Sequence, residues 1–248
     1  MDKLKVKSLG KALDILMLFS EHPYEYGISE LARNTGLPKS SVHNILSTFA
    51  YYDVLQYNSK TQMYQLGYKA LELGNVFQKK DSFVTVVQPF LKDISESTKE
   101  CVYLAKPSGS QVVYLDALFP DNAVGNNVVG RKAPMYCTGI GKAILSKMDD
   151  SFVAEVISAP LEAFTAYTII DREKLQNEIA EIRRNGYAVD NMEHEFGIKC
   201  VAVPILSYKG ELLGGISISG PSLRFPAETI EKYSVLLRDI AGKLQKYL

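Results

Sequence analysis

Residues 28–66 read ISELARNTGLPKSSVHNILSTFAYYDVLQYNSKTQMYQL. This stretch predicts a short helix, a glycine turn, a second helix and a two-stranded ribbon, which together outline a winged helix-turn-helix. We expect Ser29 to cap the first helix, Gly36 to end it in a left-handed conformation, and Pro38 to open the second helix.

The second helix of this stretch has an apolar side and a polar side. The apolar side follows the helical repeat, with Val42, Ile45, Leu46 and Phe49. The other side carries Lys39 at the helix start and then the hydrogen-bonding residues Ser40, Ser41, His43, Asn44, Ser47, Thr48 and Tyr51. Asn can hold adenine through two hydrogen bonds, and Ser or Thr can bond bases or phosphates, so this side suits the major groove of DNA. A solvated helix face looks similar, but the turn before it and the ribbon after it favour DNA recognition.

The ribbon is predicted from two short strands, Asp53–Tyr57 and Gln62–Leu66, joined by Asn58–Thr61. The joining residues are the polar types found at hairpin tips. We expect Ser59 and Lys60 at this tip to contact phosphates or the minor groove.

Composition is that of a globular protein: 248 residues, 46% hydrophobic and 23% charged, enough for one or two domains. No apolar run approaches the roughly 20 residues of a membrane helix, and no apolar signal segment begins the sequence, so we expect a cytoplasmic protein. The three cysteines form no CxxC pair, which argues against a disulfide framework or a structural zinc site. Net charge is zero, and residues 1–66 hold seven Lys and Arg against six Asp and Glu, so DNA binding would depend on a few placed lysines and on dimerisation.

Two further helices complete the predicted N-terminal region. A helix from Ser8 to Phe19 follows a lysine-rich segment, Lys3–Lys11, that suits either phosphates or solvent. Its apolar residues are Leu9, Leu13, Ile15, Leu16 and Phe19, which we expect to pack across the helix-turn-helix. A linker helix over residues 67–80 continues an apolar stripe of Leu66, Ala70, Leu73 and Phe77. This stripe would either pair with a second copy of the chain or dock on the larger domain.

Residues 81–248 are predicted to form the larger domain. Helices are expected over Phe83–Ser97, from Thr138-Gly139, over Arg172–Arg184 and from Pro226. Strands are expected over Cys101–Ala105, Gln111–Ala117, Tyr187–Asn191, Lys199–Leu206 and Leu212–Ser219, with a turn at Lys106–Ser110 and a Gly/Asn-rich loop at Asp121–Arg131. This order predicts an α+β domain around an antiparallel sheet.

The chain resembles the IclR family of bacterial transcriptional regulators over essentially its whole length. The motifs that carry the resemblance are GLPKSSVHNIL, YQLG, CTGIGKAIL, GYAVDNMEHEFGIKCVAVPI and GGISISGP. The resemblance implies a winged-helix DNA-binding domain, a GAF-like effector domain, homodimers or homotetramers, and a small organic or aromatic acid as effector. It also implies an effector pocket in which Gly139 and Ile140 contribute backbone N–H groups and Asp190, Cys200, Ser217 and Ser219 contribute side chains.

The pattern around these residues is consistent with such a pocket. Alternate strand residues share a face, so Ser217 and Ser219 point the same way, and Cys200 lies on the corresponding side of its strand. A helix N-terminus at Gly139 beside them would favour an anion. Asp190 would repel a ligand carboxylate unless it is protonated or separated by water, so we expect it to accept a bond from a ligand hydroxyl or a water. Arg131 and Lys132 could offset charge or lie at the surface.

Two chemical alternatives arise from Asp190, Glu193, His194, Glu195 and Cys200, which lie within eleven residues. They could hold a metal, although the spacing matches no established zinc pattern. They could also form a Cys-His nucleophile, although Cys200 reads as part of an internal strand. We therefore expect a DNA-binding regulator without cofactor, metal or catalytic activity. The alternative is a metabolite-sensing or catalytic protein whose helical domain binds protein rather than DNA.

Overall fold

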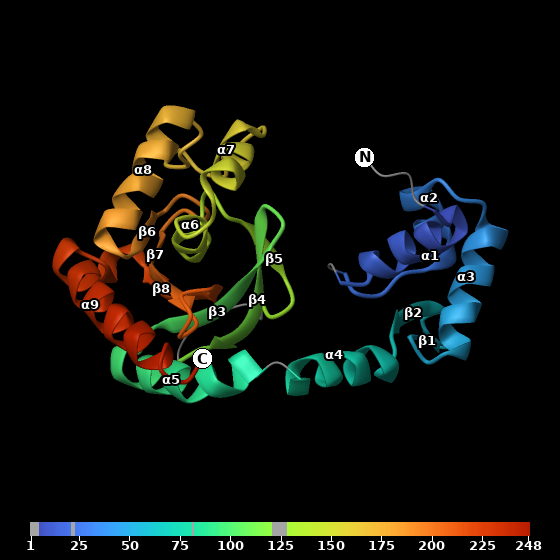
Figure 1. Cartoon of the computed structure of the whole chain (residues 1–248). Coiled ribbons are helices and arrows are strands. Elements are labelled where there is room, and N and C mark those ends of the chain that lie inside the picture. The colour runs from blue at the N-terminus through green and yellow to red at the C-terminus, as the bar shows by residue number, and fades with distance from the viewer. Residues whose placement is uncertain (1–4, 21–22, 81, 121–127) are drawn as a thin grey trace. The chain divides into compact units, whose positions relative to one another are not determined.

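The computed structural model describes residues 5–20, 23–80, 82–120 and 128–248. The first residues of the lysine-rich segment, the start of the larger domain at Asp81 and residues 121–127 of the predicted loop lie outside this description. The chain divides into two compact units, Met1–Lys80 and Asp81–Leu248 (Figure 1).

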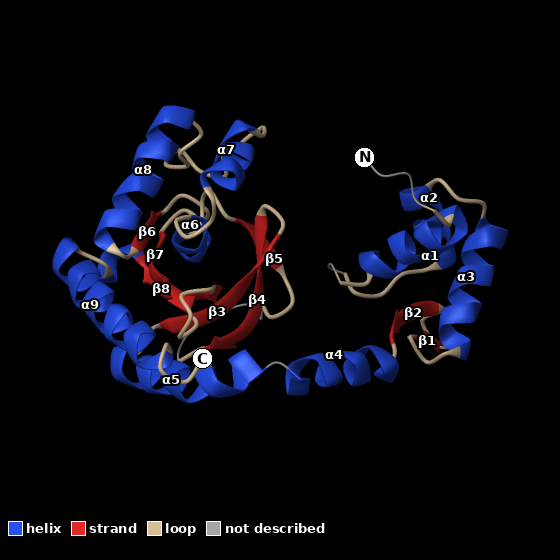
Figure 2. Cartoon of the chain, in the orientation of Figure 1, coloured by secondary structure: helices blue, strands red, loops and turns tan. Residues whose placement is uncertain are grey.

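The N-terminal unit is a winged helix-turn-helix with a helix at each end (Figure 2). Its elements are α1 (Lys7–Leu18), α2 (Ile28–Thr35), α3 (Lys39–Tyr51), β1 (Leu55–Asn58), β2 (Met63–Leu66) and α4 (Tyr68–Lys80). β1 and β2 pair antiparallel, and Tyr26 adds a bridge to Tyr64. The core of this unit, to which α4 contributes no described residue, consists of Ile15, Phe19, Tyr26, Leu31, Val42, Leu46, Leu55 and Tyr64.

The predicted punctuation of the helix-turn-helix is partly confirmed. Gly36 ends α2 with φ +69°, the left-handed conformation that glycine adopts without steric cost, and Pro38 immediately precedes α3. The prediction for Ser29 was wrong, because Gly27 is the N-cap residue of α2 and no side chain caps this end. Ser29 lies within the first turn instead.

Two of the apolar residues predicted to pack from the first helix are on its surface. Leu9 is 56% exposed and Leu13 is 42% exposed, whereas Ile15 and Phe19 are fully buried. The apolar repeat of α1 thus contains two separate stripes, and only one of them faces the core of this unit. On the other stripe, Leu9 and Leu13 stay exposed among the described residues of this unit.

The second unit is built on a six-stranded antiparallel sheet in the order β5-β4-β3-β8-β7-β6. The strands are β3 (Cys101–Ser108), β4 (Gln111–Leu118), β5 (Lys132–Pro134), β6 (Ala188–Asn191), β7 (Ile198–Leu206) and β8 (Leu212–Pro221). The helices are α5 (Ser82–Thr98), α6 (Gly139–Leu145), α7 (Asp150–Ser158), α8 (Arg172–Asn185) and α9 (Ala227–Leu244), with a short 3₁₀ turn, η1, at Ser222–Arg224. This confirms the predicted α+β class.

The sheet separates two hydrophobic cores. On one face, α5 and α9 pack against Val102, Leu104, Val201, Val203, Ile216 and Ile218. On the other face, α6 packs against the small residues Ala105, Ala188 and Ala202, and α7 and α8 pack around α6 (Figure 1). The small residues let α6 approach the sheet closely, so that it lies on the face that the sequence predicted to be small and polar.

Three details of this unit differ from the sequence-based expectation. The hairpin turn is shorter than predicted, because Lys106, Pro107 and Ser108 remain paired in β3 and only Gly109-Ser110 connect the strands. α7 and β5 were not predicted, since the first is short and the second has only three residues. No helix among the described residues is both long and apolar enough to cross a membrane.

Candidate functional site

The polar side of α3 is exposed, as predicted for a recognition helix. Val42 and Leu46 are fully buried on the opposite side. Of the predicted DNA-contacting residues on α3, Ser41 is half-buried, and the exposed ones are Lys39, Ser40, His43, Asn44, Ser47 and Thr48. Thr48 donates its hydroxyl to the Asn44 backbone oxygen at 2.8 Å, which leaves the Asn44 amide side chain available. This surface therefore presents hydrogen-bonding groups without a block of charge.

The tip of the wing is organised by a single asparagine. Asn58 Oδ1 accepts hydrogen bonds from the backbone N–H groups of Lys60 (3.0 Å) and Thr61 (3.4 Å). This Asx-type turn fixes the backbone of the tip. The predicted contact residues Ser59 and Lys60 are both exposed there.

The second candidate site lies on the sheet face covered by α6. Directly opposed residues on neighbouring strands share a face. The pairs Asp190–Cys200, Cys200–Ser219 and Ser219–Cys101 therefore form one row across β6, β7, β8 and β3. The adjacent row contains Ala202, Ser217 and Tyr103. The sequence correctly predicted that Cys200, Ser217 and Ser219 share one side of the sheet.

The beginning of α6 lies directly against this row. A Cβ atom at Gly139 would lie 3.1 Å from Cβ of Cys200 and 3.3 Å from the backbone nitrogen of Asp190. Thr138 caps α6 by accepting a hydrogen bond from the Gly141 N–H at 3.2 Å. Among the described hydrogen bonds, none uses the backbone N–H of Gly139 or Ile140. All six predicted effector residues line one cavity, together with Arg131 and Lys132.

Asp190 is only 3% exposed within this cavity. Its Oδ1 accepts a hydrogen bond from the Glu193 backbone N–H at 2.7 Å. The pKa of Asp190 is raised from 3.8 to about 7, mainly by burial and also by the charge of Glu193, while backbone N–H groups and Lys142 oppose the shift. The side chain can therefore be protonated near neutral pH. Protonation is one of the two conditions under which Asp190 would not repel a ligand carboxylate.

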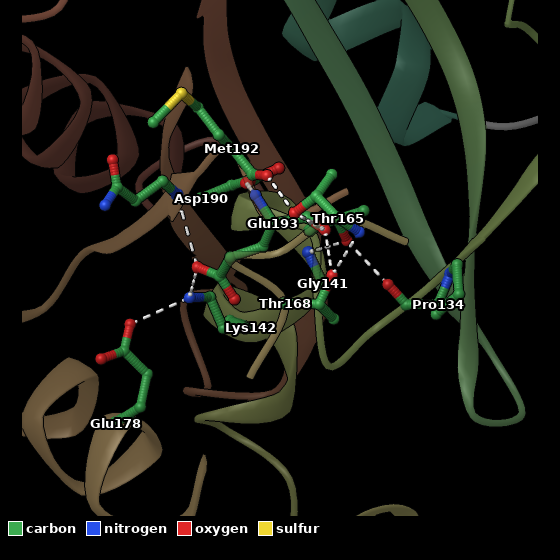
Figure 3. Close-up of polar contacts among 11 residues, drawn as sticks. Pro134, Gly141, Lys142, Thr165, Thr168, Glu178, Asp190, Met192 and Glu193 are labelled. Atoms are coloured by element: carbon green, nitrogen blue, oxygen red, sulfur yellow. Dashed lines mark hydrogen bonds and ion pairs between the residues drawn. The ribbon is translucent and has the colours of Figure 1, made fainter. Parts of the chain in front are cut away.

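A buried ion cluster supports the cavity from behind (Figure 3). Lys142 is fully buried, and its Nζ lies 2.5 Å from Glu193 Oε1 and 2.9 Å from Glu178 Oε1. Burial alone would lower the pKa of Lys142, but the two carboxylates outweigh it and the pKa is raised. Sequence reasoning missed Lys142 and Glu178, because nothing in the local pattern of GIGKAIL shows that its lysine is buried.

Two threonines attach the loop after Asp190 to a loop far away in the sequence. The hydroxyl of Thr165 donates to the Met192 carbonyl at 2.7 Å, and the hydroxyl of Thr168 donates to the Glu193 carbonyl at 2.6 Å (Figure 3). Glu193 is thus held through its backbone and its side chain at once. These contacts also escaped sequence analysis, because they join irregular segments.

Aromatic residues on the same face were also missed. Tyr103 lies opposite Ser217, and its ring packs edge-on against Tyr114 (5.6 Å between centroids) and Phe119 (6.0 Å). All three residues line the cavity. The alternation of residues along the two strands could have placed both tyrosines on this face.

The two chemical alternatives receive no support from the geometry. Among the residues that the structure describes, no three or more His, Cys, Asp or Glu side chains are placed to share a metal ion. Cys200 Sγ lies 2.9 Å from Ser219 Oγ, and burial raises the pKa of its thiol, which disfavours the thiolate that a nucleophile needs. His194 packs its ring against Phe164 instead.

Comparison with known protein families covers both units. Residues 8–59 match the IclR helix-turn-helix domain, and residues 78–246 match the bacterial transcriptional regulator IclR C-terminal domain. The chain is 30% identical to the HTH-type transcriptional regulator KdgR of Escherichia coli (strain K12) over 243 residues, which cover 96% of this chain and 91% of that protein. Such relatives are transcriptional regulators and not enzymes, as the sequence predicted.

Solved structures show the same fold. The Thermotoga maritima IclR crystal structure superposes with a TM-score of 0.80 at 30% identity, covering 98% of both chains. An IclR homolog from Microbacterium hydrocarbonoxydans, crystallised in complex with 4-hydroxybenzoate, superposes with a TM-score of 0.84 and covers 96% of this chain and 98% of that chain. At 23% identity the latter likeness shows the fold alone. The two family-domain matches, the relative that aligns over nearly its whole length and the shared fold agree. The chain therefore belongs to the IclR family of bacterial transcriptional regulators.

Proposed function

We propose that the chain binds a specific DNA operator through α3 and the wing, and that a small organic acid in the sheet cavity modulates this binding. The observation that carries the proposal is the two-sided character of α3. One side is locked into the core by Val42 and Leu46, and the other presents an exposed row of hydrogen-bonding groups. Such an arrangement would hold the proposed base-contacting side chains on a rigid support, which favours the proposal.

The proposed DNA contacts fall into two kinds. Asn44, Ser40 and Ser47 are the candidates for base edges, with Ser41, His43 and Thr48 beside them. Lys39 and Lys60 are the candidates for phosphates, with Ser59 at the wing tip. With so few cations, each subunit would show a shallow dependence of affinity on salt.

The proposed effector site is the cavity beside α6. The free N–H groups of Gly139 and Ile140 would donate hydrogen bonds to the carboxylate of the effector. Cys200, Ser217 and Ser219 would form hydrogen bonds with the remaining polar atoms of the effector. Ser217 and Ser219 are 2% and 5% exposed, so their hydroxyls face the cavity rather than bulk solvent. The 4-hydroxybenzoate bound by the Microbacterium hydrocarbonoxydans homolog supports an organic acid as the class of ligand.

We further propose that the working form is a homodimer or homotetramer that holds two α3 helices on a near-palindromic site. α4 supports this, because Leu71, Leu73, Val76 and Phe77 are 62%, 61%, 49% and 58% exposed. An isolated helix of this length is marginal in water, so a second copy of α4 is its natural partner. The effector would then act by binding more tightly either to the arrangement of subunits that can bind the operator or to the arrangement that cannot.

The test of DNA binding is fluorescence anisotropy with a labelled fragment from upstream of the chain's own gene and an unrelated fragment of equal length. We expect tighter binding to the upstream fragment and a change in that affinity when 4-hydroxybenzoate, benzoate or lactate is added. Equal affinity for both fragments at every salt concentration would overturn the operator proposal.

A variant pair tests the effector site separately. Ser217→Ala combined with Ser219→Ala should abolish the rise in melting temperature that a binding acid produces. Ser151→Ala on α7 is the matched control, because this serine is exposed. An unchanged rise in the double variant would place the ligand elsewhere.

A further inference from the structure

The carboxyl group of Asp190 lies where the effector's own carboxylate is proposed to bind. A Cβ atom at Gly139 would lie 3.5 Å from Cβ of Asp190, so this side chain borders the free amides at the start of α6. Asp190 is 3% exposed and lines the cavity. An incoming anion would therefore meet this carboxyl group with little water between them.

The cation that acts on the charge of Asp190 is Lys142, which is already paired, and Arg131 and Lys132 also line the cavity. Lys142 neutralises part of the charge of Glu193 and Glu178, to which it is bonded. The Oε2 oxygen of Glu193 is buried and has no hydrogen-bond partner among the described residues. A further negative charge near this carboxylate would therefore be unfavourable. The ionisable groups that act on Asp190 or feel its charge are Glu193, Lys142, Tyr114, Cys137 and Cys200, and His194 contributes a backbone hydrogen bond.

Asp190 thus lies between the amides proposed for the effector's carboxylate and the cluster of Lys142, Glu193 and Glu178, whose one ammonium group is already shared by two carboxylates. Two like charges in a shared buried site do not both stay ionised, and one of them takes up a proton. The effector's carboxylate is held by the amides of α6, which favour its ionised form. Asp190 is the group left to accept the proton.

We propose that Asp190 binds the effector's carboxylate as a neutral carboxylic acid, donating its own proton into a hydrogen bond with the anion. Where Asp190 is ionised in the free protein, one proton from solvent is then taken up with each effector molecule. This inference rests on the proposed effector site and assigns Asp190 a donor role there, in place of the acceptor role that the sequence suggested.

The ionisation of Asp190 in the free protein sets the pH range of the effect. Burial raises its pKa to about 7, and a bound anion raises it further. Below about pH 6 the free protein already carries the proton, so affinity for an ionised acid is constant. Above about pH 7 the proton must be acquired on binding, and the dissociation constant rises roughly tenfold per pH unit.

The experiment is titration calorimetry of the full chain with 4-hydroxybenzoate, benzoate and lactate between about pH 6 and pH 8.5, where the acids remain ionised. Each titration is repeated in two buffers of different ionisation enthalpy, which gives the number of protons taken up. We expect a flat dissociation constant at the acid end, a steep rise above about pH 7, and an uptake approaching one proton at pH 8.5.

Two variants identify the titrating group. Asp190→Asn keeps the shape and a donor N–H, so it should bind with a dissociation constant that no longer depends on pH. His194→Asn removes the histidine that lines the same cavity and should keep the wild-type pH dependence.

The outcomes separate the two proposals. Binding without proton uptake, or a pH dependence that survives in Asp190→Asn, overturns the role of Asp190 and leaves the effector site standing. Failure of all three acids to bind at any pH overturns both. If Asp190→Asn does not fold, the proton count of the wild type decides alone.

Discussion

Replacing Lys142 by methionine should destabilise the second unit by about 3–5 kcal/mol, because it removes the cation that is bonded to Glu193. Lys142 is fully buried, and the Glu193 side chain is 4% exposed, so water cannot replace the lost partner. Glu178 is 28% exposed on its side chain and recovers part of its hydration. The loss of unfolding free energy therefore arises mainly from the buried Glu193 carboxylate, which is left without its cation. The methionine fills most of the space of the lysine side chain.

Urea unfolding followed by far-ultraviolet circular dichroism is the appropriate assay, since the chain contains no tryptophan. Lys147→Met is the matched control two residues beyond α6. This lysine is exposed, and its replacement should change the unfolding free energy by no more than about 0.5 kcal/mol.

A combined variant tells whether the loss of stability comes from charge or from packing. Lys142→Met with Glu193→Gln and Glu178→Gln carries no charge in the cluster and should recover most of the loss. A single substitution that costs less than about 1 kcal/mol would refute the reasoning, because the cluster would then be hydrated or dispensable. A combined variant as unstable as the single one would attribute the loss to packing rather than charge.

Three further outcomes are expected. Because the folded-state pKa of Asp190 is about 7 and its ordinary value is 3.8, the folded chain binds more protons than the unfolded chain between these values, so this residue lowers stability as pH rises. Asp190→Asn should thus be more stable than the wild type at pH 8, by at most about 4 kcal/mol, and a urea-unfolding difference that does not vary from about pH 4 to pH 8 would contradict this. Gly141→Ala should cost about 1–3 kcal/mol or more, because its Cβ would lie 2.4 Å from Thr138 Oγ1, whereas Gly242→Ala on α9 meets nothing within 4 Å. Equal melting temperatures of these two variants would show that the turn before α6 relaxes freely. Asn44→Ala should weaken operator binding by about 1–3 kcal/mol and non-specific binding much less, measured by anisotropy on both DNAs. Equal losses would remove base reading by this residue.

Periodicity was sufficient wherever a residue's environment is decided by its own element. The shared face of Ser217 and Ser219 follows from strand geometry, and the structure confirms it. α8 shows the same rule for a helix, since Leu175, Ile179 and Ile182 are buried at the helical repeat and Gly186 ends the helix in a left-handed conformation. The face of α1 could not be chosen this way. Leu9 and Leu13 satisfy the same repeat as Ile15, and only the position of α2 and α3 determines which stripe is buried.

The buried ion cluster of Lys142, Glu178 and Glu193 could not be predicted from periodicity either, because its partners come from distant parts of the chain. Lys142 would be assigned to a solvated surface by composition alone, since a lone buried ammonium group is prohibitively costly. It is buried because Glu178 and Glu193 reach it from 36 and 51 residues further along the chain. The same Glu193 donates its backbone N–H to Asp190, so the group proposed to take up a proton from solvent when the effector binds is held by a residue of this cluster. Thr165 and Thr168 hold the carbonyl groups of Met192 and Glu193, so Asp190 is joined to this distant loop through a short series of hydrogen bonds that no local sequence pattern contains.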